Sequence, residues 1–547
     1  MVLRKVISVF ALAAASMFGA ASVHAKAFYI SGTSTRTTGG TSCSDALSVA
    51  WFNNTSSWGS ATHQISPGTT VFLCGTFQGK PGQQLLIARG SGTATAPITI
   101  KFMTGAVLSA PYWSGLGAIY IQGRSYIVVD GGTNGVIQNT ANGTGRAYRQ
   151  NSVAIYALWC THCTVQNLTI QNLYVRTSST DTAATHSVNC VYWHQANYMT
   201  VNHITCHDAS WAIVGDGNNF TLENSNIYHV DHGVASGPAG KASAYSIHNN
   251  HFHDFANWDS PSNTYHHDAI HLWGQRGGTI TSGAIYSNTF DGDFGVNITA
   301  HVFLQDSVQH VSVYNNIAAS PSTRTINSIW FSATSTSMPG GSATGNSAYN
   351  NSINAGGHRA GSAIFADNQL QFTAVNNIMG GGVSDISVQR GTTLTSTGIN
   401  NNVYRDLLAE FGDRNSFSYK GLWFYGISQW RATCHCDSAS KMIVGTQTTA
   451  FSSTTLASSS TVAGDGVTTS GVQVSAATGT ASEPVDVNMA VVSSATTADP
   501  EFELLTTVGE GNGINLSDLA VDDLAPLALD KNGKPRPTAG PWNVGPF

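Results

Sequence analysis

The sequence predicts an all-β fold, a single-stranded right-handed parallel β-helix (a solenoid) with an N-terminal cap and a C-terminal strap. Three observations predict it. A short asparagine motif recurs along the middle of the chain, a short apolar run recurs with it, and only 10% of the 547 residues are charged. Residues that long helices need are scarce relative to Gly, Ser, Thr, Asn and Ala, so the composition favours strands and turns.

The first 25 residues are typical of a secretory signal peptide rather than of a folded domain. Two basic residues and an apolar run (6–21) precede a small-residue cleavage site that ends at Ala25. No later stretch approaches the roughly 20 apolar residues of a membrane span. We therefore expect a secreted or periplasmic protein without a membrane span, whose mature form begins near Lys26.

Residues 26–110 are expected to form the N-terminal cap and the first coils. Eight cysteines in an oxidising compartment favour disulfides or buried thiols over a metal site. Cys43 and Cys74 flank this region and are predicted to pair. The motifs Cys160-x-x-Cys163 and Cys434-x-Cys436 are too short to join distant segments.

The asparagine repeat defines the expected helix core, residues 111–414. Its form is apolar–x–Asn–(Asn)–x–Ile/Phe, and successive copies are 21, 25, 38, 28, 35, 26 and 25 residues apart. A base period with insertions is the signature of stacked coils. Each asparagine can bond its counterpart one coil further along and so satisfy the backbone of the turn. The apolar markers are Val201, Leu222, Ile247, Ile285, Val313, Ala348, Ala374 and Ile399.

A second, period-two run precedes most of these markers and is predicted to be a strand. When the runs are aligned on their inward Ile or Val, the next residue must point outward, because side chains alternate along a strand. Aromatic residues occupy both ends of this outward row and small residues its middle. The row is Tyr120, Tyr156, Tyr192, Val214, Ala235, His271, Phe303, Trp330 and Phe365.

Rings that repeat about every 4.8 Å suit the stacking of sugar rings, with Val214 and Ala235 as the floor of a candidate cleft. The alternative is that inserted loops cover the row as a second small core. The candidate substrate-binding residues are Tyr156, Tyr192, Trp273, Phe303, Trp330 and Phe365.

Both ends of the chain complete the pattern. The N-terminal part reads FYISGTST, SCSDALSVAWFNN and GTTVFLCGTFQG, and the C-terminal part reads DPEF (499–502) and DKNGKPRPTAGPWNVGPF (530–547). With the repeat between them, the chain resembles the pectate-lyase-like right-handed parallel β-helix superfamily of secreted bacterial proteins over nearly its whole mature length. The resemblance implies the fold and a closing segment over 499–547, but it does not decide the chemistry.

Two segments interrupt the pattern before the closing segment. Residues 415–444 carry several aromatic residues and the Cys434-x-Cys436 motif, and are expected to form a strap on the last coils. Residues 445–498 are rich in Ser and Thr and almost uncharged, and read as an insertion or linker.

Histidine and aspartate gather beside the gap in the outward row. Ten of the 19 histidines lie between residues 203 and 271. The alignment places Asp231 beside His267 and His232 beside Asp268, one coil apart, with Asp216 on the neighbouring coil. The plain alternative to a functional role is a structural hydrogen-bond ladder at the turns.

Our first hypothesis is β-elimination of an acidic polysaccharide. It requires a base, and a cation that neutralises the uronate carboxylate. Asp231 and Asp268 would orient the base, and Arg276 or Lys241 would face the carboxylate. The candidate bases or acids are His232, His267, His271 and Tyr265.

Other hypotheses remain. A glycoside hydrolase would use two carboxylates among Asp216, Asp231 and Asp268. The same His and Asp residues suit Zn²⁺ or another transition metal. A third class is a non-catalytic extracellular protein that binds or adheres to glycans.

Short motifs do not decide between these hypotheses. YHHDAIH (265–271) resembles the Tyr-x-x-Asp-x-His element of alginate epimerases, but His271 comes one residue late, which predicts that its side chain lies on the other face of the strand. The paired-Asp and Gly-His-Gly pattern of polygalacturonase-like hydrolases is missing from the sequence. Asp291-Gly-Asp293 is typical of a turn, with a contribution to a Ca²⁺ site as the alternative. No cofactor is otherwise assigned.

The net charge of the chain restricts the kinds of partner that it can bind. The net charge is −6 and there is no basic run, which argues against nucleic acid. We expect an extracellular polysaccharide as the partner and a monomeric protein.

Overall fold

The computed structural model describes most of the chain from Lys26 onward. The described residues are 26–181, 187–261, 266–319, 327–333, 343–354, 361–380, 383–389, 391–406 and 417–444, with short stretches at 490–492, 501–503, 529–530 and 534–536. The expected signal peptide, Tyr265 and nearly all of the Ser/Thr-rich segment lie outside them. No helix among the described residues is long and apolar enough to cross a membrane.

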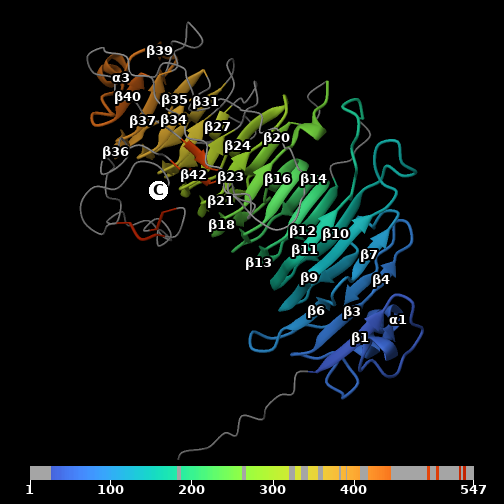
Figure 1. The fold of residues 1–547 in the computed structure, drawn as a ribbon. Coiled ribbons are helices and arrows are strands. Elements are labelled where there is room, and N and C mark those ends of the chain that lie inside the picture. The colour runs from blue at the N-terminus through green and yellow to red at the C-terminus, as the bar shows by residue number, and fades with distance from the viewer. Residues whose placement is uncertain are drawn as a thin grey trace, which may run out of the picture.

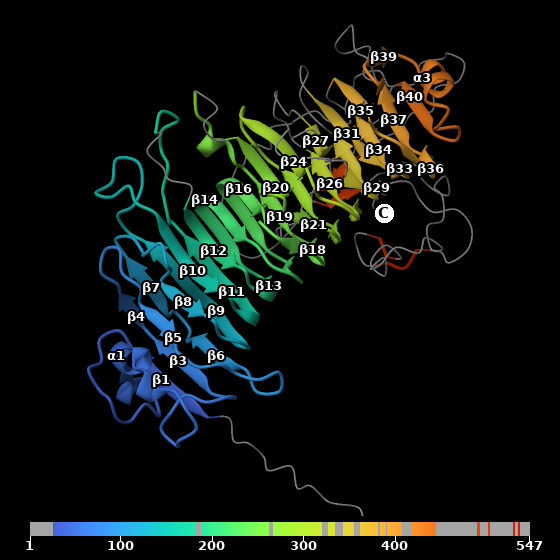
Figure 2. The ribbon, with the colours of Figure 1, turned by 180° about the vertical axis from the view of Figure 1, so that it is seen from behind.

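The strands stack along one long axis, from α1 (Val49–Asn53) at the N-terminal end to α3 (Ile427–Cys434) at the other (Figures 1 and 2). Almost all pairings in the main sheet are parallel, each between a strand and its counterpart in the next coil. This is the predicted parallel β-helix. Each coil contributes a strand to each of three faces.

The first face carries the outward row predicted from the sequence. Its strands are β5 (Leu86–Ala88), β8 (Ile119–Gln122), β10 (Ser152–Leu158), β12 (Val188–His194), the second halves of β14 (Thr205–Gly215) and β16 (Asn226–Ser236), β20 (His267–Trp273), β24 (Ile298–Gln305), β27 (Asn327–Ser332), β31 (Ser362–Asp367), β35 (Ser384–Val388) and β38 (Phe417–Tyr419).

The second face carries the apolar markers. Its strands are β1 (Ala27–Ser31), β3 (Thr70–Cys74), β6 (Ile98–Phe102), the first halves of β9 (Ile127–Asn139) and β11 (Thr161–Gln171), β13 (Asn197–Asn202), β15 (Thr221–Glu223), β18 (Tyr245–His248), β22 (Gly283–Tyr286), β25 (Val311–Tyr314), β29 (Ser347–Tyr349), β33 (Phe372–Val375) and β36 (Leu394–Asn400).

The third face closes each coil. It contains the second halves of β9 and β11, the first halves of β14 and β16, and β4 (Thr76–Gln78), β7 (Val107–Ala110), β19 (His251–His253), β23 (Thr289–Asp291), β26 (Ile317–Ala319), β30 (Ser352–Asn354), β34 (Ile378–Gly380), β37 (Val403–Asp406) and β40 (Lys441–Val444). Inward side chains from all three faces form one continuous apolar core.

The register predicted from the sequence is confirmed on two faces. Every apolar marker from Val201 to Ile399 pairs with the next marker. The outward row is also continuous, because each member from Tyr120 to Phe365 pairs with the next. A period-two pattern fixes register strongly where one face is buried, since a slip of one residue would exchange core and surface.

The predicted asparagine ladder is also confirmed. From Asn250 to Asn377, each side-chain amide donates to the side-chain oxygen of the next asparagine at 2.9–3.1 Å, and to a backbone carbonyl of the preceding coil. The preceding Asn of the motif has a left-handed backbone, for example φ 55° at Asn315, which asparagine tolerates well. The ladder residues are Asn250, Asn288, Asn316, Asn351, Asn377 and Asn402.

Disulfides involve all eight cysteines. The predicted Cys43–Cys74 pair is confirmed, and each short motif closes on itself. The Cys190–Cys206 bond, which the sequence did not indicate, joins β12 on the first face to the first half of β14 on the third face. No thiol among the described residues is therefore left to bind a metal.

The C-terminal end of the helix is covered by the segment expected as a strap. After β38, the chain forms β39 (Leu422–Phe424) and α3, and the Trp430 ring stacks on Phe417 with centroids 5.2 Å apart. Further along, β41 (Ala490–Val492) and β42 (Glu501–Glu503) form an antiparallel pair. Arg536 then donates to the side chain of Asn315 at 3.0 Å, so part of the last segment lies against the coils.

Candidate active site

Four side chains of the first face converge on one point; they are called the His/Asp centre below. His232 comes from β16, His266 directly precedes β20, and Asp268 and His271 belong to β20. Asp268 Oδ2 lies 3.3 Å from His232 Nε2, 3.6 Å from His266 Nε2 and 3.4 Å from His271 Nδ1. The four atoms all lie within 4.8 Å of one another. His232 therefore lies beside Asp268, as predicted.

His271 lies in the outward row as predicted, paired with Ala235 and Phe303 and stacked on the Phe303 ring at 4.7 Å. Asp268 Oδ2 nevertheless lies 3.4 Å from His271 Nδ1. The pairing of β20 with β24 shifts register only between His267 and Asp268, and the two strands stay in register from Asp268 to Trp273. Asp268 Oδ1 accepts the backbone N–H of Ala300 in the next coil at 3.0 Å. That bond turns the carboxylate along the sheet and leaves Oδ2 facing His271.

A second set of polar groups fixes the rings of the centre. Asp231 contacts His232 Nδ1 at 3.1 Å and His267 Nδ1 at 3.1 Å through its two carboxylate oxygens. The Trp211 indole N–H also donates to Asp231, at 3.2 Å. On the other side, His271 Nε2 contacts Gln305 Oε1 at 3.0 Å. These bonds leave His232 Nε2 and His271 Nδ1 directed at the centre.

Burial changes the roles predicted for some residues. His267 is fully buried, with both ring nitrogens bonded to the carboxylates of Asp231 and Asp259 at 3.1 Å. It therefore positions Asp231 and does not reach a substrate. Asp231 and Asp268 are also buried, and although burial opposes their charge, neighbouring imidazoles hold both pKa values below the usual range.

The three histidines of the centre differ in charge. Burial disfavours the cation of His232, but Asp231 and Asp268 outweigh that effect and raise its pKa to about 10. Burial lowers the pKa of His271 to about 4. Burial also lowers the pKa of His266, whose side chain is 44% exposed. At neutral pH, His266 is thus an uncharged imidazole that solvent can reach.

Asp216 and Lys241 share a separate pocket of about 240 Å³ at the edge of the first face. Asp216 Oδ1 lies 2.6 Å from His194 Nδ1. On the next coil, a Cβ at Gly237 would lie 2.1 Å from the Trp273 ring, so only glycine leaves room for that ring. Trp273 then lies between this pocket and His271, whose ring centroid is 4.7 Å away.

Arg276 lies in the turn after β20, outside both groups. Its backbone has a left-handed φ of 51°, and the neighbouring Gln275 N–H bonds to Pro238 O on the preceding coil at 3.2 Å. Arg276 therefore lies one coil from the turn that leads to Lys241. Tyr265, the remaining candidate base, is outside the described residues.

The aromatic row stacks on itself more than predicted. Tyr156 and Tyr192 have centroids 4.6 Å apart, and Phe303 stacks between His271 and Trp330 at 4.7 and 4.5 Å. Because in-register rings cover one another's faces, Tyr156 and Phe303 are only 8% and 7% exposed. Sugar rings therefore cannot stack on every ring of the row. The rings do not lie face to face at Trp330–Phe365, where the planes meet at 72°, or at Tyr120–Tyr156, where they meet at 51°.

Sequence reasoning missed several members of the site. His266 was seen as part of the cluster but not as a candidate base. Gln305 lies two positions from the outward Phe303, a signal that strand alternation could have provided, whereas Trp211 lies two positions from the inward Ile213, so alternation gave no such signal. Trp211 and Trp273, 6.3 Å apart, are both partly exposed beside the centre.

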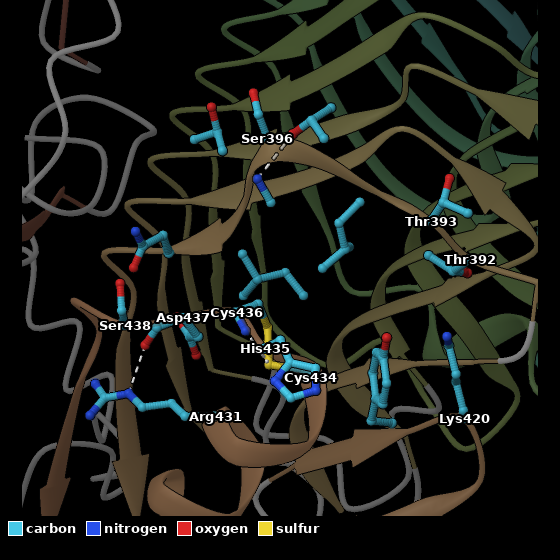
Figure 3. A pocket seen from close by; sticks show the side chains of 17 residues that line it. Thr392, Thr393, Ser396, Lys420, Arg431, Cys434, His435, Cys436, Asp437 and Ser438 are labelled. Carbon is cyan, nitrogen blue, oxygen red and sulfur yellow. Dashed lines mark hydrogen bonds between the residues drawn. A yellow bond between two sulfur atoms is a disulfide. The ribbon is translucent and has the colours of Figure 1, made fainter.

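Two further features lie outside this site. Asp291 contacts His251 Nε2 at 2.6 Å and Gly292 has φ 70°, which is the turn expected for Asp291-Gly-Asp293. A pocket of about 740 Å³ lies beside the C-terminal strap, between the 392–400 segment and the Cys434–Ser438 turn (Figure 3). Arg431 there donates to the Asp437 carbonyl at 2.7 Å, and the lining includes several hydroxyl groups but no His/Asp cluster among the described residues.

His301, on β24, is a buried histidine whose protonation couples to stability. It packs against Phe290 and Phe294, and its Nδ1 contacts Ser328 at 2.9 Å. Burial lowers its pKa to about 3, whereas an unfolded histidine has a pKa of about 6.5. Between these values the unfolded chain binds a proton that the folded chain does not, so the free energy of unfolding falls as the pH falls.

We expect His301→Gln to remove this acid sensitivity. Between pH 7 and pH 4.5, the variant should lose about 3 kcal/mol less unfolding free energy than the unmodified protein, at about 1.4 kcal/mol per pH unit below 6.5. Urea unfolding at the two pH values measures the difference. The exposed His63→Gln variant serves as the control and should behave as the unmodified protein does; an equal loss in both variants contradicts the assignment.

Fold and site together define a parallel β-helix protein with an outward-facing His/Asp centre. No protein-family model matches the sequence, and no curated protein matches it significantly. Among solved structures, the chain is similar to a lacto-N-biosidase from Eubacterium ramulus, with a TM-score of 0.43 and 11% identity over 77% of this chain and 67% of that one.

It is also similar to a pectate lyase, with a TM-score of 0.35 and 11% identity over 68% of this chain and 82% of that one. An alginate lyase from Paenibacillus gives a TM-score of 0.34 and 14% identity over 59% of this chain and 93% of that one. At these identities and TM-scores, none of the three defines the activity or the substrate of this chain.

Proposed function

We propose that the chain is a secreted polysaccharide lyase that cleaves an acidic glycan by β-elimination. The observation that carries the proposal is an exposed, uncharged imidazole, His266, at the rim of a buried His/Asp centre. Partly exposed indole rings of Trp211 and Trp273 flank that centre. Aromatic surface can hold a sugar ring beside a base that abstracts its proton.

His266 is the proposed base. In β-elimination, the base takes the proton from the carbon α to the uronate carboxyl, the bond to the β glycosidic oxygen breaks, and a carbon–carbon double bond forms. The leaving oxygen takes up a proton. A base for this step must be unprotonated at neutral pH and accessible, and His266 meets both conditions. His271 is less suited, because its side chain is 11% exposed and both ring nitrogens face protein groups.

A hydrolase is less consistent with the same residues. Its general acid must hold a proton at neutral pH, which requires a carboxyl group with a raised pKa. Asp231 and Asp268 have lowered pKa values instead and are buried beneath the histidines. They orient imidazoles, which is the supporting role that elimination by a histidine base needs.

The glycan would lie across the interruption of the aromatic row. There, Val214 and Ala235 replace rings, while Tyr192 ends the stack on one side. Trp273 lies over Gly237 on the other side. Lys241 and Arg276, in turns of consecutive coils, remain the side chains proposed to attract the acidic groups of the chain.

Product analysis tests the proposal. We expect incubation with polyuronates to give oligosaccharides with an unsaturated, unhydrated end, detected by mass spectrometry and by new ultraviolet absorbance. Neutral glycans should remain intact. Hydrated products would replace the lyase by a hydrolase, and glycan binding without any product would favour a non-catalytic binding protein.

A further inference from the structure

The His/Asp centre has the geometry of a metal site. Asp268 is fully buried, and its Oδ2 has no hydrogen-bond partner among the described residues. Two buried histidines nevertheless direct ring nitrogens at this atom, His232 Nε2 at 3.3 Å and His271 Nδ1 at 3.4 Å. In a tetrahedral site with bonds of about 2.1 Å, neighbouring ligand atoms are about 3.4 Å apart. The spacing is therefore that of ligands around one shared ion.

The neighbours of these ligands strengthen this reading. A metal-binding histidine typically uses its other ring nitrogen to contact a carboxylate or carbonyl oxygen, which fixes the ring and its tautomer. His232 uses Nδ1 to contact Asp231 at 3.1 Å, and His271 uses Nε2 to contact Gln305 at 3.0 Å. Asp268 is held in turn through Oδ1 by the backbone of Ala300. All three candidate ligands are thus oriented from outside the centre.

The buried charges of the centre also favour a metal ion. Asp231 and Asp268 bring a buried carboxylate to each ring nitrogen of His232, Asp231 at Nδ1 and Asp268 at Nε2. Buried charge is costly unless it is paired or coordinates a metal. Asp231 is already bonded to His267 and Trp211, and a divalent ion at the centre would compensate Asp268. Two imidazoles and one carboxylate suit zinc and similar transition metals, whereas Ca²⁺ prefers oxygen ligands.

We propose that His232, Asp268 and His271 bind a divalent transition-metal ion, with Zn²⁺ as the representative, and that His266 faces its open coordination position. This arrangement of three protein ligands and an accessible side is typical of catalytic rather than structural zinc sites. The binding of the ion does not depend on the activity proposed above. Its use as the counter-charge of a uronate carboxylate does rest on that proposed function.

Metal uptake tests the site directly. The protein is stripped with EDTA, desalted, and titrated with ZnCl₂ by calorimetry, and bound zinc is counted by elemental mass spectrometry. We expect one Zn²⁺ per chain. Asp268→Asn, which keeps the volume and the oxygen that accepts from Ala300, and His271→Gln should each lower the affinity at least about 100-fold. Millimolar CaCl₂ should not displace the zinc.

His229→Ala is the matched control. The His229 side chain is 45% exposed and lies 3.8 Å from Asp208, outside the centre, so the variant should bind zinc as the unmodified protein does. Failure of the stripped, folded protein to take up zinc would overturn the proposal, as would Asp268→Asn binding zinc with unchanged affinity. If Asp268→Asn does not fold, visible absorption of the Co²⁺-loaded unmodified protein and its loss in His271→Gln decide the question.

The two proposals can fail separately. Zinc uptake that depends on Asp268, with no product from any glycan, would retain the metal site and remove the lyase. Unsaturated products from a protein that binds no zinc would retain the lyase and remove the metal site.

Discussion

Replacing His266 with alanine is expected to lower turnover of an acidic glycan by about 10²–10⁴-fold, the usual contribution of a general base. The side chain is partly exposed and packs at the rim of the centre, so its removal creates no buried cavity. The fold should therefore persist, with an unchanged far-ultraviolet circular dichroism spectrum. Initial rates of double-bond formation, followed by absorbance, measure the effect.

His229→Ala again provides the control for this variant, because the exposure of its side chain is nearly the same and it also lies near an aspartate. Its turnover should stay within about twofold of that of the unmodified protein. If His266→Ala kept full activity, the base would have to be another group, and His271 would be the next candidate. A change in KM alone would indicate that His266 only binds substrate.

The coil register was predictable because two independent periodic signals agree. The asparagine motif marks one corner of each coil, and the period-two run marks the first face, so a slip of one residue would break both. This is why the positions of Tyr192, Val214 and Ala235 follow from the sequence, and why His232 falls opposite Asp268.

The details of the centre were less predictable because they depend on how individual side chains are bonded and buried. Strand alternation places His271 in the outward row, and it does not show that the Asp268 carboxylate reaches the His271 ring at 3.4 Å. The roles of His266 and His267, two adjacent histidines, differ because of burial alone. No periodic pattern distinguishes an exposed imidazole from one enclosed by two carboxylates.

The capacity of the aromatic row to stack sugar rings was overestimated for a related reason. A spacing suited to sugar rings is also suited to stacking the protein's own rings on one another. The ring faces of Tyr156 and Phe303 are therefore stacked against neighbouring rings. Val214 and Ala235 are the positions that indicate a binding site, because small residues replace rings there and the adjacent Tyr192 lacks a ring neighbour on that side.

The asparagine ladder should contribute strongly to stability, and Asn316→Ala is expected to cost about 3–6 kcal/mol of unfolding free energy. Asn316 is buried, and its amide donates to Ile285 O at 2.9 Å and to Asn351 Oδ1 at 3.0 Å. Its Oδ1 accepts from both the backbone and the side chain of Asn288, at 3.0 Å each. Alanine leaves several of these buried groups unpaired, at about 1–3 kcal/mol for each one.

Urea unfolding measures this loss, with Asn134→Ala as the control. Asn134 is exposed and accepts a single bond from the Gly105 N–H, so its loss should cost less than about 1 kcal/mol. Equal costs for the two variants would mean that the ladder contributes no more than one surface hydrogen bond. A large cost for Asn316 alone would show why the motif recurs. Its amide satisfies backbone groups of the preceding coil and bonds the asparagine of the next one, so a coil without it leaves its neighbour incomplete.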